Sequence, residues 1–166
     1  ARSSVMDLVS GYGFARQGYP VRGLFSIPFV GLSSNGIPMY NINGKITSTD
    51  IDFQTRDNID YLKYEGPTDP TITGSFGNIF TYKAFKLNVF ITYSFGNVVR
   101  LNPCFSYQYS DLSSMPREFK NRWTVPGDEK RTNIPAIISK RQYEDNKDLM
   151  YAYNAYNYST ERIAKG

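Results

Sequence analysis

The sequence offers few side chains for covalent or metal chemistry. It contains no histidine and a single cysteine, Cys104, which excludes imidazole catalysis, His-ligated metals, an internal disulfide and four-cysteine metal sites. Without a histidine as its base, Cys104 is predicted to be an unpaired structural thiol. Asp128 and Glu129 are adjacent carboxylates, but neighbours in a Pro-Gly loop rarely face one substrate, and nothing nearby supplies a nucleophile. We therefore expect no enzyme activity, no cofactor and no metal.

Aromatic side chains are the second group of residues that could act at a functional site. The C-terminal part contains five candidates for contact with a substrate or with a covering protein: Trp123, Tyr151, Tyr153, Tyr156 and Tyr158. An aromatic ring matches the apolar face of a sugar ring, and Tyr and Trp are enriched at the hot spots of protein interfaces. A third interpretation is that these rings pack the surrounding segment against itself. The residues alone leave all three interpretations open.

The charge of the chain is weakly positive and spread out. Nineteen Lys and Arg against fifteen Asp and Glu give a net charge of +4, but the cations are not clustered, so nucleic acid is not an expected partner. A short helix is predicted within residues 114–123, with Ser114 as its cap and Pro116 in its first turn. Glu118 and Arg122 are expected to pair on a solvated face of this helix rather than bind an acidic substrate.

Length and patterning indicate one domain built from strands. The chain has 166 residues, the length of one domain or two at most, and a mean hydropathy of −0.45 excludes a bundle of membrane helices. Alternation of apolar and polar residues predicts strands in five segments: 19–32, 39–42, 45–49, 71–82 and 87–96. The predicted fold class is all-β, with antiparallel strands.

Proline, glycine and asparagine mark the breaks between these strands. Pro28 lacks a backbone donor, so the first strand is predicted to bend, to bulge or to lie on an edge there. Asn43-Gly44 is the signal for a two-residue hairpin turn. Residues 66–70 contain two prolines and a glycine, which predicts a rigid connection without regular structure.

The clearest alternation in the chain lies at residues 87–96. One face of this strand is apolar and ends in aromatic residues: Leu87, Val89, Ile91, Tyr93 and Phe95. A strand of about ten residues with interfacial aromatics suits a tilted crossing of a bilayer, which would make this face lipid-facing. The inner face of a soluble β-sandwich shows the same alternation, so that interpretation also stays open.

The connections between the strands differ strongly in length. A turn of four residues, Lys83, Ala84, Phe85 and Lys86, joins two strong strands, whereas residues 97–157 show no sustained strand pattern. Such a long connection is functional or covered by a partner. Short turns at one end and long loops at the other are typical of bacterial outer-membrane barrels. We therefore predict a periplasmic turn and a long extracellular loop over 97–157.

Several motifs follow one another over most of residues 18–166. They are Gly18–Phe25, Phe29–Leu32, Tyr64–Thr71, Gly74–Leu87, Phe90–Asn97, Met115–Trp123, Pro126–Glu129 and Tyr153–Ser159. In this order they resemble the C-terminal barrel part of the SusC/RagA-type TonB-linked outer-membrane proteins. Many of these proteins have an acidic loop after their counterpart of the first strand. Residues 41–45 lack its carboxylates, so no calcium is predicted there.

The resemblance implies a nutrient-uptake protein of the bacterial outer membrane. It implies a 22-stranded barrel with an N-terminal plug, which imports glycans, oligosaccharides or peptides with energy from TonB. A SusD-like surface lipoprotein would lie over its extracellular loops. Four or five strands cannot close such a barrel, so we expect the whole chain, residues 1–166, to be a segment of a larger transporter in contact with outer-membrane lipid.

Two other kinds of protein are compatible with the residues. A soluble, β-rich cell-surface module that binds carbohydrate or protein would need both faces of the strand at 87–96 to be protected from water. An extracellular adhesive protein built from Tyr- and Asn-rich loops would be expected to contain internal repeats, and the sequence contains none. Sedimentation with and without detergent separates the membrane protein from the soluble module.

Overall fold

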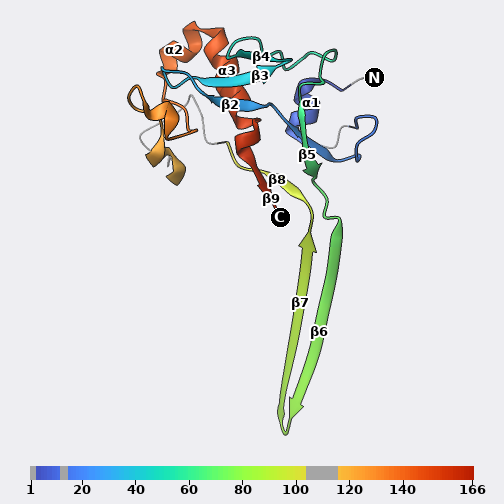
Figure 1. Ribbon diagram of the computed structural model, residues 1–166. Helices are drawn as coiled ribbons and strands as arrows, with labels where there is room; N and C mark the ends of the chain where they lie inside the picture. Colours follow the sequence, from blue (N-terminus) through green and yellow to red (C-terminus); the bar gives the residue numbers. More distant parts are fainter. Residues whose placement is uncertain (1–2, 12–14, 104–115) are drawn as a thin grey trace.

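Two very different parts make up the chain in the computed structural model, which describes residues 3–11, 15–103 and 116–166. The first is a long hairpin of two strands, β6 (Ile72–Tyr82) and β7 (Phe85–Phe95). The second, called the head below, contains all the other described residues and lies at the open end of the hairpin (Figure 1). The hairpin projects from the head, so its turn is the part of the chain farthest from the head.

Short antiparallel strands form three small sheets in the head. The sheets contain β1 (Gly23–Ser26) with β5 (Lys63–Pro67); β2 (Phe29–Leu32), β3 (Pro38–Ile42) and β4 (Lys45–Thr47); and β8 (Val98–Arg100) with β9 (Ile163–Lys165). The prediction of antiparallel β-structure is therefore confirmed at this coarse level. The strands of the described residues form no closed barrel.

Helices in the head are few and short. They are α1 (Val5–Ser10), α2 (Lys140–Asp145) and α3 (Lys147–Asn157), with 3-10 turns η1 (Arg117–Asn121), η2 (Asp128–Lys130) and η3 (Thr160–Arg162). Side chains satisfy the free N–H groups at their starts: Ser4 caps α1, Ser139 caps α2 and Asn146 caps α3. Among the described residues, no helix has both the length and the apolarity of a membrane span.

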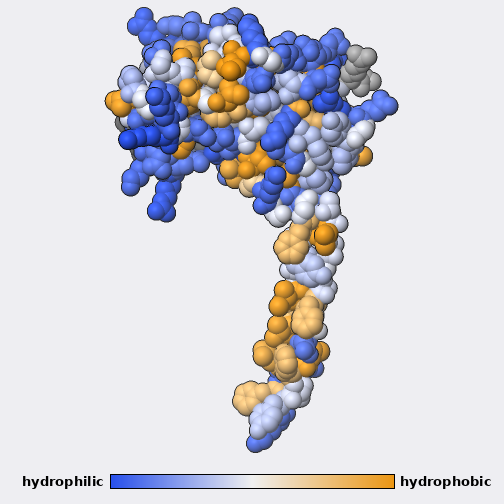
Figure 2. Space-filling view, viewed as in Figure 1, coloured by the Kyte–Doolittle hydropathy of each residue, from blue (hydrophilic) through white to orange (hydrophobic). Residues whose placement is uncertain are grey.

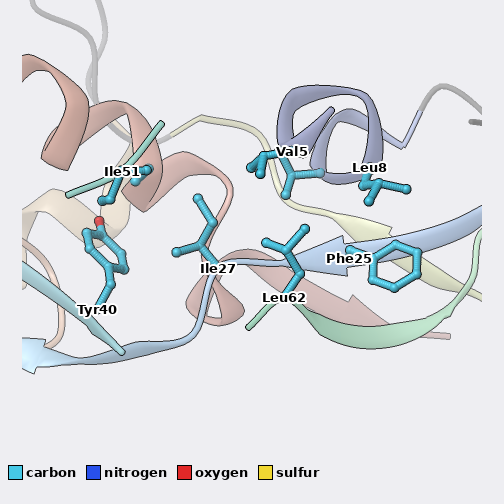
Figure 3. Close-up of a cluster of buried hydrophobic side chains, with 9 residues drawn as sticks. Val5, Leu8, Phe25, Ile27, Tyr40, Ile51 and Leu62 are labelled. Atoms are coloured by element: carbon cyan, nitrogen blue, oxygen red, sulfur yellow. The ribbon is translucent and has the colours of Figure 1, made fainter. Parts of the chain in front are cut away.

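The core of the protein lies in the head. Figure 3 shows its larger cluster, which joins α1, β1, β3 and α3 through the buried residues Val5, Leu8, Val9, Phe25, Ile27, Tyr40, Ile51, Leu62 and Ala155. The hydroxyl of Tyr40 donates to the carbonyl of Ala152 over 2.7 Å, which ties β3 to α3. A second cluster contains Phe119, Tyr143, Tyr153 and Tyr156. Neither cluster contains a hairpin residue.

Two of the predicted breaks are found where expected. The first predicted strand divides at Ile27–Pro28 into β1 and β2. At this break the backbone of Ile27 bonds to the segment after α3. Its N–H donates to the Tyr158 carbonyl over 3.0 Å, and its carbonyl accepts from the Thr160 N–H over 3.1 Å. Asn43 and Gly44 form the turn between β3 and β4, with φ of 53° and 85°. These left-handed angles are those of a type I′ turn.

Three local predictions differ from the structure. Gly66 and Pro67 belong to β5. Proline has no backbone N–H, but β5 lies at the edge of a two-stranded sheet, where that hydrogen bond is not required. The segment 97–157, predicted to be mostly irregular, contains a short strand and two helices in addition to 3-10 turns: β8, α2 and α3. Glu118 pairs with Arg162 at 2.9 Å and not with Arg122, because η1 is a 3-10 turn, in which residues i and i+4 do not share a face. Ser114, its predicted cap, lies outside the described residues.

Candidate functional site

The hairpin is amphipathic along its whole length. Its strands pair without a break from Ile72 opposite Phe95 to Tyr82 opposite Phe85, and residues directly opposite each other point to the same side. One side, called the apolar face below, contains Ile72, Phe76, Phe80, Tyr82, Phe85, Leu87, Val89, Ile91, Tyr93 and Phe95, with Gly74 and Asn78 among them. The other side, called the polar face below, contains Thr73, Ser75, Thr81, Lys86, Asn88, Thr92 and Ser94, with Gly77, Ile79 and Phe90 among them.

The apolar face is open to its surroundings. Apart from the partly buried Val89, its side chains are exposed, from 45% for Tyr93 to 79% for Phe85. In the space-filling view, apolar side chains follow the hairpin while the visible surface of the head is mainly hydrophilic (Figure 2). An exposed apolar surface of this extent marks a site of interaction with a membrane or with another protein.

The length and end groups of the hairpin match a bilayer. Strands of eleven residues span about 34 Å from the first to the last Cα atom, because each of the ten steps adds about 3.4 Å. A tilt of about 40° brings this to roughly 26 Å, close to the apolar band of about 25 Å in outer-membrane barrels. Aromatic rings lie at both ends of the apolar face: Tyr93 and Phe95 stack at 5.7 Å near the head, and Tyr82 and Phe85 lie at the turn.

The turn of the hairpin is tighter than predicted. Only Lys83 and Ala84 lie between the strands, and Lys83 has a left-handed φ of 51°. Phe85 and Lys86, predicted to belong to the turn, are paired residues of β7. A two-residue turn with a positive φ at its first position matches the twist of the strands that it joins.

Glycines in β6 allow aromatic rings of β7 to lie across the hairpin. A Cβ atom added at Gly77 would be 2.9 Å from the Phe90 ring, and one added at Gly74 would overlap the Tyr93 ring. The rings cover the bare backbone of the neighbouring strand. This packing accounts for Phe90, a large apolar residue on the polar face.

Both strands of the hairpin have an open edge. Among the described residues, β6 and β7 bond only to each other and form a two-stranded sheet. Their outer backbone N–H and C=O groups can therefore pair with further strands. In a membrane they must do so, because hydrocarbon cannot satisfy them.

Two of the five candidate aromatic residues are interior residues of the head. Tyr153 and Tyr156 are only 0% and 2% exposed. The hydroxyl of Tyr153 donates to the Ala136 carbonyl over 2.7 Å, and burial raises the pKa of this phenol well above 10.0. The Tyr156 ring packs edge-on against Phe29. Both side chains therefore pack the head, as in the third of the interpretations that the sequence left open, because α3 turns positions 153 and 156 inward.

Trp123 is half-buried and also has a structural role. Its indole N–H donates to the Glu129 carboxylate over 3.2 Å, and its ring lies over Gly36. The Asp128 carboxylate accepts from the backbone of Val125 and Thr124 at 3.1 and 3.0 Å. The adjacent carboxylates therefore hold the loop after Trp123 in place.

Acid is expected to release Trp123 from this loop. Hydrogen bonds from the backbone of Glu129 and Gly127, and then from the Trp123 indole, hold the pKa of Glu129 below its ordinary 4.5. A carboxylate whose pKa is lower in the folded than in the unfolded state stabilises the fold at pH values above its unfolded-state pKa. This stabilisation is lost as the pH falls through its folded-state pKa. Fluorescence of Trp123, the only tryptophan, should therefore change with a midpoint below pH 4.5. Glu129→Gln should remove that transition, and an unchanged transition would contradict the role of Glu129.

A methyl group at Gly36 is expected to displace Trp123. An added Cβ would lie 2.6 Å from the Trp123 ring and 2.8 Å from the Ala136 Cβ. Overpacking of this kind costs about 1–3 kcal/mol. Gly44 is a matched control, because it has a similar positive φ but nothing within 4 Å. Urea denaturation should show a larger loss of stability for Gly36→Ala than for Gly44→Ala, and equal losses would count against the contact.

Tyr151 and Tyr158 line a pocket on the head. This pocket has a volume of about 430 Å³. Its lining combines aromatic, amide and carboxylate side chains with two apolar residues, Met6 and Pro103; the others are Asp52, Phe53, Gln54, Tyr151, Asn154, Asn157 and Tyr158. The Phe53 ring centroid is 6.0 Å from that of Tyr158 and 6.5 Å from that of Tyr151. Rings flanked by amides and a carboxylate suit a neutral polar ligand with an apolar face, such as a sugar. The sequence-based candidates did not include Phe53, since nothing local marks it.

Known proteins offer no further guide to this site. No protein-family model matches the chain, and no curated protein matches it. Among the described residues, no group of three or more His, Cys, Asp or Glu side chains is placed to hold a metal ion, and Cys104 lies outside those residues. The apolar face and the pocket are therefore the two features of the described residues that bear on function.

Proposed function

We propose that the chain is a wall segment of a TonB-dependent transporter in the bacterial outer membrane. The observation that supports this proposal is the exposed apolar face on a hairpin whose other face is polar. Residues in this arrangement separate hydrocarbon from a water-filled lumen. The transporter would import glycans, oligosaccharides or peptides together with a SusD-like lipoprotein, as the motif resemblance implies.

The arrangement of the two parts supports a direction for the segment. The turn at Lys83 and Ala84 and the head lie at opposite ends of the hairpin (Figure 1). Outer-membrane barrels have short turns on the periplasmic side and longer structures outside. In this proposal the turn is periplasmic, and the head, with residues of the predicted loop 97–157, is extracellular and accessible to substrate and lipoprotein.

The proposed mechanism is passage rather than chemistry. Leu87, Val89 and Ile91 would contact lipid acyl chains, whereas Asn88 and Thr92 on the polar face would contact water in the lumen. The open edges of β6 and β7 would bond to neighbouring strands of the wall. Energised movement of a plug, which belongs to other parts of such a transporter, would open the path.

A soluble sandwich accounts less well for the hairpin. In that interpretation the face that contains Leu87 and Ile91 would pack against a second sheet, yet these side chains are 60% and 54% exposed. Exposed apolar area costs about 25 cal/mol per Å² relative to burial. A face with ten apolar positions therefore favours a covering of hydrocarbon.

Sedimentation with and without detergent tests this proposal. We expect a monomeric detergent complex, and association of the chain when detergent is removed. The triple variant Leu87→Thr, Val89→Thr and Ile91→Thr keeps strand propensity and should reduce the need for detergent. A monodisperse monomer of the unchanged chain in plain buffer would overturn the proposal.

A soluble carbohydrate-binding module is the second candidate, favoured by the pocket at Phe53, Tyr151 and Tyr158. Calorimetric titration with oligosaccharides tests this function. Loss of one stacking ring should weaken binding about tenfold, so Tyr151→Ala should bind more weakly than the unchanged chain. Tyr82→Ala, in the hairpin, is the control and should bind equally. Absence of sugar binding in a soluble chain would reject this candidate.

A further inference from the structure

The tip of the hairpin combines positive charge with exposed aromatic rings. Lys83 and Lys86 are the only charged residues between positions 71 and 99, a stretch without any carboxylate. Tyr82 and Phe85 are paired at the last position of the ladder and are 70% and 79% exposed. No acidic side chain of the hairpin can therefore neutralise the two ammonium groups.

The two lysines lie on different sides of the hairpin. Lys86 is paired with Thr81, so it belongs to the polar face. Lys83 lies in the turn, and its Nζ is 5.4 Å from the centre of the Tyr82 ring. Because Tyr82 belongs to the apolar face, the Lys83 ammonium lies at the end of that face.

We propose that Lys83, which lies beside the exposed rings of Tyr82 and Phe85 at the end of the apolar face, binds the phosphate of an anionic lipid headgroup. This inference rests on the proposed function, in which acyl chains cover the apolar face. Where the hydrocarbon ends, the headgroups begin, and aromatic rings are enriched at that level. A lysine ammonium beside them is attracted to anionic headgroups, and its flexible stem can reach them.

The occupant is a lipid rather than a free phosphate ion. A single exposed ammonium group lacks the enclosing donors that hold a free anion. A lipid is already held by its acyl chains on the apolar face, so its phosphate is present near Lys83 at a high effective concentration. The site therefore depends on the apolar face and the lysine together.

Lipid-doped micelles test the site, because water at the micelle surface can satisfy the open strand edges. The chain carrying Ala84→Cys and Cys104→Ser is labelled at position 84 with acrylodan in a zwitterionic detergent. Phosphatidylglycerol or phosphatidylcholine with brominated acyl chains is then added, and quenching is measured. We expect phosphatidylglycerol to quench at an about fivefold lower mole fraction, the factor that one lysine near an anionic surface contributes.

Lys86 provides the matched control. Lys83→Gln should abolish the preference for phosphatidylglycerol, whereas Lys86→Gln should keep it. Equal quenching by the two lipids in the unchanged chain, or equal loss in both variants, would overturn the inference while leaving the proposed function intact. Absence of quenching by either lipid would overturn the inference and also contradict lipid contact by the hairpin.

Discussion

Replacing Ile91 with arginine is expected to weaken membrane association by about 2–4 kcal/mol, the cost of that side chain on the lipid face of a barrel near the bilayer centre. Ile91 lies near the middle of the hairpin, opposite Phe76 on the apolar face. Thr92 is its neighbour in the chain but faces the other way, opposite Ser75. An arginine there faces the polar side, so Thr92→Arg is expected to cost less than about 1 kcal/mol.

Partition into zwitterionic detergent micelles, where surface water can satisfy the open strand edges, measures this difference as the bound fraction of each variant. Trp123 fluorescence should be unchanged in both variants, because neither residue touches the head, and this signal controls for unfolding. Similar binding of the two variants would show that side-chain direction does not matter. That outcome would contradict a hairpin with one lipid-facing side.

The hairpin could be predicted because its signals are local. Apolar and polar residues alternate, and β-branched and aromatic residues are frequent, which indicated both strands. Because successive side chains of a strand point to opposite sides, the alternation also showed which side of each strand is apolar. The turn length was wrong: a four-residue turn would pair Tyr82 with Leu87, whereas the structure pairs it with Phe85. This shift of two residues keeps the parity of the ladder. The apolar faces of the two strands coincide in either register.

Helix α3 could not be predicted from propensity. Its sequence is rich in tyrosine and asparagine, which are only moderate helix formers. The buried positions Ala152, Tyr153, Ala155 and Tyr156 do have helical spacing, but tyrosine is not a clear marker of the interior. The tertiary contacts of Tyr153 and Tyr156 decide the outcome, and these contacts have no counterpart in the local sequence.

The pocket on the head had no sequence signal at all. It joins residues 52–54, Pro103 and the end of α3, which are distant in the chain. Only folding brings Phe53 beside Tyr151 and Tyr158. Sequence reasoning could name the tyrosines as contact candidates, but it could not separate those that line a surface from those that fill the interior.

Arg100 is expected to be a centre of stability where the hairpin joins the head. It follows β7 by a few residues, and its guanidinium donates to the carbonyls of Val9, Phe25 and Ser159 at 3.1, 2.6 and 3.4 Å. Burial lowers its pKa to about 10. The side chain therefore ties α1, β1 and the segment after α3 to β8.

The positive charge of Arg100 also acts on a buried carboxylate, that of Glu65. Only 4% of the Glu65 side chain is exposed, and one of its oxygens has no hydrogen-bond partner. Lys63 approaches the other oxygen at 3.5 Å, and the charge of Glu65 favours the protonated form of Arg100. Removing the positive charge of Arg100 would leave this carboxylate less compensated.

Arg100→Met is therefore expected to lower the free energy of unfolding by about 3–5 kcal/mol, because three carbonyls lose a charged donor and each hydrogen bond of this kind contributes about 1.5–3 kcal/mol. Urea denaturation followed by Trp123 fluorescence measures the loss. Arg141→Met is the control: Arg141 forms an exposed pair with Asp145, and such pairs contribute at most about 1 kcal/mol.

Glu65→Gln separates the electrostatic part of the effect from the hydrogen bonds. Without a negative charge at position 65, the loss caused by Arg100→Met should be smaller than in the unchanged chain, and the difference is the coupling energy between the two sites. The part that remains belongs to the three carbonyls, which lose a charged donor. Equal losses for Arg100→Met and Arg141→Met would contradict this role, because an exposed arginine has no buried partners to leave unsatisfied.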